Sequence, residues 1–128
     1  MSKVLVVEDD TSTAELIKFT LEAKGLNVDT AGDGGEAVKK VRTNTPDLIV
    51  LDIMLPTMDG YQVCEIIKHN IMWQNLPIIM LSAKIRREDI SKGIEKGADE
   101  YMTKPFDPNK LMERVIFFLS KKEIKKES

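Results

Sequence analysis

The chain has 128 residues, 42% of them hydrophobic and 31% charged, and a formal net charge of -2. This composition is typical of one globular domain with a full hydrophobic core, and the near-neutral charge gives no electrostatic basis for binding nucleic acid or an anionic membrane surface. Because Cys64 is the only cysteine, we expect no intrachain disulfide. No apolar run approaches the roughly 20 residues of a bilayer span, and the N-terminus is unlike a signal peptide, so we expect a cytoplasmic protein.

Apolar runs bounded by turn residues predict elements that alternate strictly between strand and helix. In chain order they are a strand over 4–7, a helix over 14–23, a strand over 26–31, a helix after Asp33, a strand over 48–51, a helix over 61–69, a strand over 78–81, a helix over 88–96, a strand over 99–102 and a helix from Pro108 to Leu119. The strand over 48–51 is apolar at every position, as expected when both faces of a parallel strand are buried.

Local signals mark several helix ends and inner faces. Thr11, Ser12 and Thr13 offer side-chain oxygens that can cap the first helix, and Gly25 can end it. Asp33 is expected to cap the second helix. The apolar residues expected on the inner sides of the first, third and fifth helices include Leu16, Ile17, Phe19, Leu21, Val63, Ile66, Ile67, Leu111, Met112, Val115, Ile116 and Leu119.

The connection over residues 70–76 carries three large apolar side chains. We expect Ile71, Met72 and Trp73 to form a lid over the edge of the core, with a patch for a partner as the alternative.

Five strand–helix units with short connections predict a parallel sheet with right-handed crossovers. The fold class is therefore α/β, and the expected arrangement is the flavodoxin-like doubly wound sheet with strand order 2-1-3-4-5. We expect the domain to cover residues 1–121, and residues 122–128 to form a charged tail or the start of a linker.

Polar side chains follow the strands at one edge of this predicted sheet. Glu8 and Asp9 follow the first strand, Asp52 the third, Ser82 ends the fourth and Lys104 follows the fifth. Clustered carboxylates repel one another unless a cation lies among them, and an all-oxygen site favours a hard ion such as Mg²⁺. A carboxylate beside a metal, a lysine and a hydroxyl is suited to accept a phosphoryl group.

Four motifs together resemble the receiver domain of two-component response regulators, with a chemotaxis-regulator-like fold. They cover residues 6–10, 51–60, 81–83 and 97–106, in order and at fitting spacing. The resemblance implies that Asp52 is the phosphoacceptor, that Asp9 binds Mg²⁺ directly and Glu8 through water, and that Met54 lends the metal its backbone carbonyl. Mn²⁺ is an alternative ion, and Asp10 is not expected to be a ligand.

The same resemblance implies roles for three residues in or just after the fourth and fifth strands. Ser82 matches the switch hydroxyl, Lys104 the phosphate-pairing lysine, with a cis bond to Pro105, and Tyr101 the aromatic residue that turns inward once Ser82 engages the phosphoryl group. Met54 and Lys84 match the positions beside the path of hydrolytic water. Because an apolar methionine cannot orient water, we expect slow self-dephosphorylation.

The implied function is signalling: a histidine kinase or histidine phosphotransfer protein gives its phosphoryl group to Asp52, and no separate substrate is turned over. The readout surface would be the fourth helix, fifth strand and fifth helix, through which a phosphorylation-dependent homodimer can form, or a downstream output domain can be reached. This pattern resembles receivers attached to winged-helix DNA-binding domains, although the receiver itself is not expected to bind nucleic acid or membrane. The charged residues expected at a dimer contact are Arg86, Arg87, Asp99, Glu100, Lys110 and Arg114.

Three other functions fit part of the pattern. A phosphatase of the haloacid-dehalogenase type needs a second aspartate two residues after the nucleophile, where this chain has Met54. A flavin carrier needs a phosphate loop after the first strand, where residues 8–10 are acidic and would repel the phosphate. A receiver-like module that no longer accepts phosphate is the third, although every acceptor residue is present.

Overall fold

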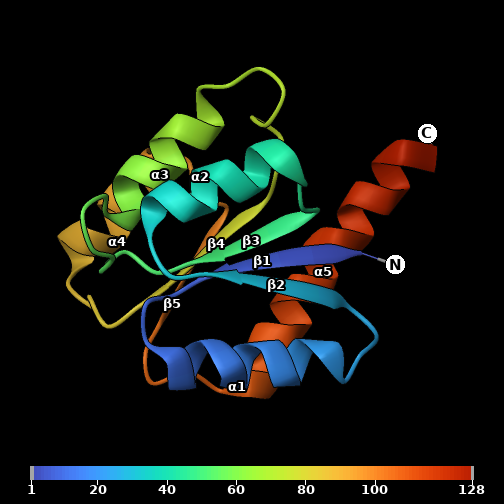
Figure 1. Ribbon diagram of the computed structural model, residues 1–128, viewed down its shortest axis with the longest axis horizontal. Helices are drawn as coiled ribbons and strands as arrows, with labels where there is room; N and C mark the ends of the chain where they lie inside the picture. Colours follow the sequence, from blue (N-terminus) through green and yellow to red (C-terminus); the bar gives the residue numbers. More distant parts are fainter. Residues whose placement is uncertain (1, 128) are drawn as a thin grey trace.

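The computed structural model describes residues 2–127 and contains a five-stranded parallel sheet in the order β2-β1-β3-β4-β5, with helices on both faces (Figure 1). The strands are β1 (Lys3–Val7), β2 (Asn27–Ala31), β3 (Leu48–Leu51), β4 (Ile78–Ser82) and β5 (Glu100–Thr103). The helices are α1 (Thr11–Glu22), α2 (Gly34–Thr43), α3 (Gly60–Lys68), α4 (Arg87–Glu95) and α5 (Pro108–Glu127). The predicted fold class and strand order are confirmed.

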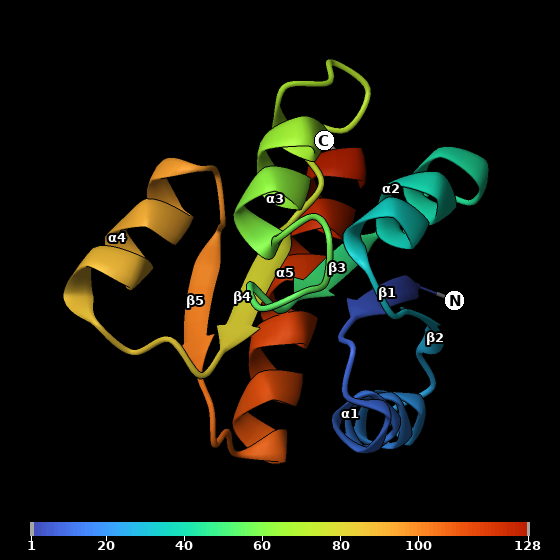
Figure 2. The same cartoon turned by 60° about the vertical axis from the view of Figure 1, so that its left-hand side comes forward.

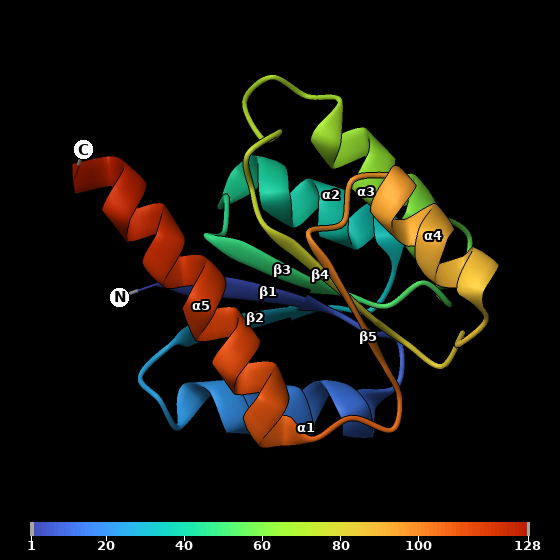
Figure 3. The same ribbon diagram turned by 180° about the vertical axis from the view of Figure 1, so that it is seen from behind.

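Two hydrophobic clusters fill the space between the sheet and its helices. On one face, α2 and α3 contribute Ala37, Val41, Val63 and Ile67 to a cluster with β1, β3 and β4. On the other face, α1 and α5 cover the sheet through a second cluster that includes Ile17 and Leu21 (Figure 3). The turned view in Figure 2 shows α4 beside β5 at one edge of the sheet and α1 beside β2 at the other. Because every residue of β3 is buried, the strand that leads to Asp52 is held on both sides.

The caps of the first two helices differ in how well the sequence predicted them. Asp33 is the N-cap of α2 and accepts a hydrogen bond from the backbone N–H of Glu36, as expected. The N-cap of α1 is Asp10, which accepts from the Thr13 backbone, so the prediction of Thr11, Ser12 or Thr13 was wrong. The chain leaves the helix through Gly25, whose positive φ of 83° suits glycine.

Several apolar residues expected to face the core are exposed. Phe19 is 76% exposed and Leu16 47% on α1, and Ile66 and Ile116 are each 41% exposed. The buried apolar stripes of α1, α3 and α5 are therefore narrower than the sequence pattern indicated. The Ile71–Trp73 lid is also corrected: Trp73 is 8% exposed, whereas Ile71 and Met72 are 83% and 82% exposed.

The last helix extends beyond the expected domain boundary. α5 continues through Glu127, so most of the segment predicted as a tail is helical. Ser128, and the side chains after Lys121, lie outside the described part of the structure. Within residues 2–127, no helix combines the length and apolar character needed to cross a membrane.

Candidate functional site

The register between β1 and β3 brings two acidic residues side by side. Val7 pairs with Leu51 at the ends of these neighbouring strands. The ladder continues one step further, because the backbone N–H of Asp52 donates to the carbonyl of Val7 at 3.0 Å and that of Glu8 donates to the carbonyl of Ala31 at 2.9 Å. Glu8 and Asp52 therefore leave adjacent strands at the same level, at the carboxyl edge of the sheet.

Three carboxylates meet at this edge. Glu8, Asp9 and Asp52 each offer an oxygen, and these atoms all lie within 4.8 Å of one another. Glu8 and Asp52 are each 5% exposed, while Asp9 faces solvent. Burial raises the pKa of Glu8, although a hydrogen bond from Lys104 opposes the rise. Such an all-oxygen set, buried on one side and open on the other, fits a hard divalent cation such as Mg²⁺ or Mn²⁺.

Lys104 supplies the positive charge beside these acids. Its ammonium donates to Oε1 of Glu8 and, at 3.2 Å, to Oδ2 of Asp52. Burial alone would lower the pKa of Lys104, but the hydrogen bond to Glu8 and the charge of Asp52 outweigh it and raise the pKa. The peptide bond between Lys104 and Pro105 is cis, as predicted. The ammonium is thus held charged against the buried carboxylates.

Ser82 and Tyr101 lie next to this group, on β4 and β5. Ser82 is fully buried, and its carbonyl accepts the backbone N–H of Lys104 at 2.9 Å. The hydroxyl of Tyr101 donates to the carbonyl of Lys84 at 2.6 Å, and burial raises its pKa to about 12. Tyr101 therefore contacts the loop that directly follows Ser82, so the two residues assigned to a switch are connected through one loop.

Met54 and Gly60 shape the loop after Asp52. The Met54 side chain is 56% exposed, and its backbone N–H donates to Oδ1 of Asp52 at 3.2 Å. The first residue of α3 is Gly60, and a Cβ built there would lie 2.2 Å from the Asp52 carbonyl oxygen. Sequence reasoning missed this contact, although Gly60 belongs to one of the four motifs. It missed Gly93 as well, where a Cβ would lie 2.9 Å from Cδ2 of Tyr101.

Not every charged residue near the site joins it. Asp10 caps α1, because its carboxylate accepts from the backbone N–H and the hydroxyl of Thr13. Arg114 donates to both carboxylate oxygens of Glu100, at 2.7 and 2.8 Å. Asp99 accepts from Lys68 at 3.1 Å. Several charges expected at a dimer contact are therefore already paired within the chain.

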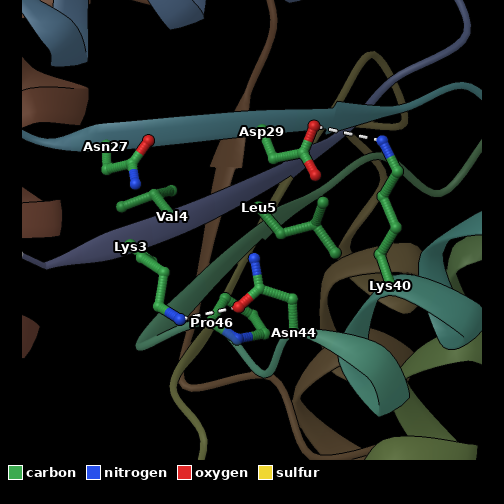
Figure 4. Close-up of a pocket in the computed structure, with 8 residues that line it drawn as sticks. All are labelled: Lys3, Val4, Leu5, Asn27, Asp29, Lys40, Asn44 and Pro46. Atoms are coloured by element: carbon green, nitrogen blue, oxygen red, sulfur yellow. Dashed lines mark hydrogen bonds and ion pairs between the residues drawn. The ribbon is translucent and has the colours of Figure 1, made fainter.

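A second polar hollow lies at the opposite end of the strands, between β2, β1 and α2 (Figure 4). Both of its lysines already have partners, since Lys40 forms an ion pair with Asp29 at 3.0 Å and Lys3 donates a hydrogen bond to Asn44 at 2.7 Å. Its volume of about 40 Å³ holds about one water molecule. The buried carboxylates and the lysine that contacts them therefore make the carboxyl edge of the sheet the candidate site.

Comparison with known proteins gives a consistent result. The family model for the response regulator receiver domain matches residues 4–116. The alkaline phosphatase synthesis transcriptional regulatory protein PhoP of Bacillus subtilis (strain 168) is 48% identical over 122 residues, which cover 95% of this chain and 50% of PhoP. The DNA-binding response regulator MtrA of Mycolicibacterium smegmatis is 41% identical over 121 residues, covering 94% of this chain and 52% of MtrA. The chain thus spans about half the length of these relatives.

Solved structures agree with the sequence comparison. The CheY-like response regulator receiver domain protein from Methanospirillum hungatei JF-1 superimposes with a TM-score of 0.91 at 29% identity, and the match covers 98% of each chain. The shared fold extends over all five strand–helix units, and the acidic edge of the sheet lies within the region matched by the family model.

Proposed function

This chain belongs to the response regulator receiver domain family, and on that premise we propose that Asp52 accepts a phosphoryl group from the phosphohistidine of a partner protein. The observation that carries the proposal is the buried Asp52 carboxylate, which has Glu8 and Asp9 on one side and the Lys104 ammonium on the other. A carboxylate flanked in this way by acids and an ammonium suits phosphoryl transfer, in which positioning and charge neutralisation supply most of the catalysis.

In the proposed reaction, a carboxylate oxygen of Asp52 attacks the phosphorus, the new P–O bond forms and the P–N bond to the partner's imidazole breaks. Lys104 is placed to pair with a phosphoryl oxygen, because its ammonium already lies 3.2 Å from Asp52. Asp9 and Asp52, with the Met54 carbonyl and with Glu8 nearby, would hold a Mg²⁺ or Mn²⁺ ion, which supplies further charge neutralisation when bound.

We assign the response to Ser82, Tyr101 and the loop that directly follows Ser82. A phosphoryl group on Asp52 would draw the Ser82 hydroxyl toward it, and the Tyr101 hydroxyl would then exchange its bond to the Lys84 carbonyl for an inward position. Such a change is a shift in the populations of two conformational states. The size of the shift depends on the extra contacts that the phosphoryl group makes in one of them. The output would be read on α4, β5 and α5.

The partners follow from the same proposal. A histidine kinase or histidine phosphotransfer protein would donate the phosphoryl group in the cytoplasm. Because the relatives are named as a transcriptional regulatory protein and a DNA-binding response regulator, we propose that the receiver controls an output domain, with a homodimer through α4, β5 and α5 as one route. In such a homodimer the ion pair between Arg114 and Glu100 would have to break, or these two residues would have to lie outside the dimer interface.

The test is incubation with a small acyl phosphate and Mg²⁺, followed by intact-mass and peptide mass spectrometry. The proposal predicts a stable mass gain of one phosphoryl group at Asp52, which D52N abolishes. Continuous release of free phosphate, with no stable product, would indicate instead a phosphatase of the haloacid-dehalogenase type. No reaction at all would indicate a silent module, and would contradict the proposal.

A further inference from the structure

Glu8 has a partner inside the protein in addition to its place among the acids. Its side chain is 3% exposed. Oxygen Oε1 accepts from the Lys104 ammonium, and Oε2 accepts from the backbone N–H of Asp10 at 3.2 Å. Both carboxylate oxygens are therefore hydrogen-bonded to protein donors before any ion is considered.

The contact between Glu8 and Lys104 crosses most of the sheet edge. Glu8 follows β1 and Lys104 follows β5, and β3 and β4 lie between these two strands. The backbone N–H of Lys104 donates a hydrogen bond to the carbonyl of Ser82. The Lys104 side chain extends past Asp52 to Glu8. A buried carboxylate is costly without a partner, so this contact stabilises Glu8 and also fixes where the ammonium lies.

We propose that Glu8 is a positioning residue that holds Lys104 beside Asp52 in the metal-free protein, and that a divalent cation must compete with Lys104 for Glu8. The inference rests on the proposed phosphoacceptor function, which assigns the cation to this group of acids. An oxygen bonded to an ammonium is less available to a metal ion, and a doubly charged ion nearby repels the ammonium. Metal binding and the Glu8–Lys104 contact therefore oppose each other.

This competition can be separated from a simple charge effect. Removing any nearby lysine strengthens Mg²⁺ binding, because one positive charge is lost, and that gain is expected whether or not Glu8 is present. A shared partner makes the two substitutions non-additive instead, which a double-mutant cycle measures directly. The relevant proteins are the wild type, K104M, E8Q and the E8Q/K104M double variant.

The experiment is calorimetric titration of each folded protein with MgCl₂ alone. K104M should strengthen Mg²⁺ binding at least about tenfold more in the wild-type background than in the E8Q background, the size expected for one charge-assisted hydrogen bond. Equal factors in the two backgrounds, within about twofold, would overturn the competition. Absence of saturable Mg²⁺ binding by the wild type would overturn both this inference and the proposed metal site, whereas labelling of Asp52 tests the phosphoacceptor separately.

Lys84 provides the matched control. It lines an open groove beside Met54, and its ammonium makes no carboxylate contact with the described side chains, those of residues 2–121. K84M should change Mg²⁺ affinity by the same factor with and without E8Q. If K104M does not fold, the Lys104 ammonium signal in the NMR spectrum of Mg²⁺-free protein gives a second test. That signal should broaden in E8Q and stay unchanged in K84M, and an unchanged signal in E8Q would contradict the positioning role.

Discussion

Substitution of Gly60 by alanine tests how the start of α3 positions Asp52. A Cβ at this position would lie 2.2 Å from the Asp52 carbonyl oxygen and 2.7 Å from Cα of Ile53. Ordinary contact distances exceed these by roughly 1 Å, so the backbone on one side must move by about that amount. All the atoms met are backbone atoms, and a rotamer change cannot relieve the clash.

Two effects of G60A are expected. Overpacking of this kind costs about 1–3 kcal/mol, which should appear as a lower urea midpoint with an unchanged m-value. Displacing the Asp52 carboxylate by about 1 Å should slow labelling by an acyl phosphate by one to two orders of magnitude, at a temperature where circular dichroism shows the variant folded.

G35A is the control for G60A, because Gly35 also lies in the first turn of a helix and meets only the Asp33 side chain, at 3.5 Å. We expect its stability to be unchanged or raised by up to about 1 kcal/mol, and its labelling rate to be that of the wild type. If G60A labels as fast as G35A and unfolds at the same urea concentration, the close contact between α3 and Asp52 has no role in positioning the phosphoacceptor.

Three further predictions address phosphoryl lifetime, alkaline stability and helix packing. M54N should shorten the half-life of phosphorylated Asp52, followed by loss of the phosphoryl mass with time, because an amide can orient water where a methionine cannot; an unchanged half-life would count against this role. Burial raises the pKa of the Cys64 thiol to about 11, so the thiol stabilises the fold below its ordinary pKa near 8.5 and loses that contribution as the pH rises through about 11. Between pH 8 and 11 the wild type should therefore lose up to about 3 kcal/mol more stability than C64A. Parallel curves of urea-derived stability against pH for the two proteins would contradict a raised pKa of the Cys64 thiol. Finally, F19S should change stability by less than about 0.5 kcal/mol, whereas I17A, two residues earlier on the opposite side of α1 and 1% exposed, should cost about 2–5 kcal/mol; similar urea midpoints would contradict this orientation of α1.

Much of the candidate site could be predicted from sequence because of the geometry of parallel sheets. The carboxyl ends of parallel strands meet at one edge, so residues that directly follow β1, β3, β4 and β5 must be neighbours once the strand order is known. This is why Glu8, Asp9, Asp52 and Lys104 were correctly expected to converge.

The helices were predicted less well in detail. Apolar periodicity located all five, but Phe19 and Ile116 were assigned to the core and lie at the surface. Periodicity identifies an apolar side of a helix without telling how wide a strip the sheet covers, and that width depends on how closely neighbouring helices pack. The N-cap of α1 was misassigned for a local reason: Asp10 and Thr13 both carry oxygens, and only the backbone path decides which one accepts the bond.

The sequence by itself determined the alternation of strands and helices, the family resemblance and the residues at the reactive edge, because each depends on local patterns and on the fixed polarity of parallel strands. Only the tertiary structure decided which groups pair: Lys104 with Glu8 as well as Asp52, Arg114 with Glu100, and the Gly60 backbone against that of Asp52. Those pairings join residues from 8 to 96 positions apart in the chain, and their geometry depends on side-chain reach and burial in the folded protein.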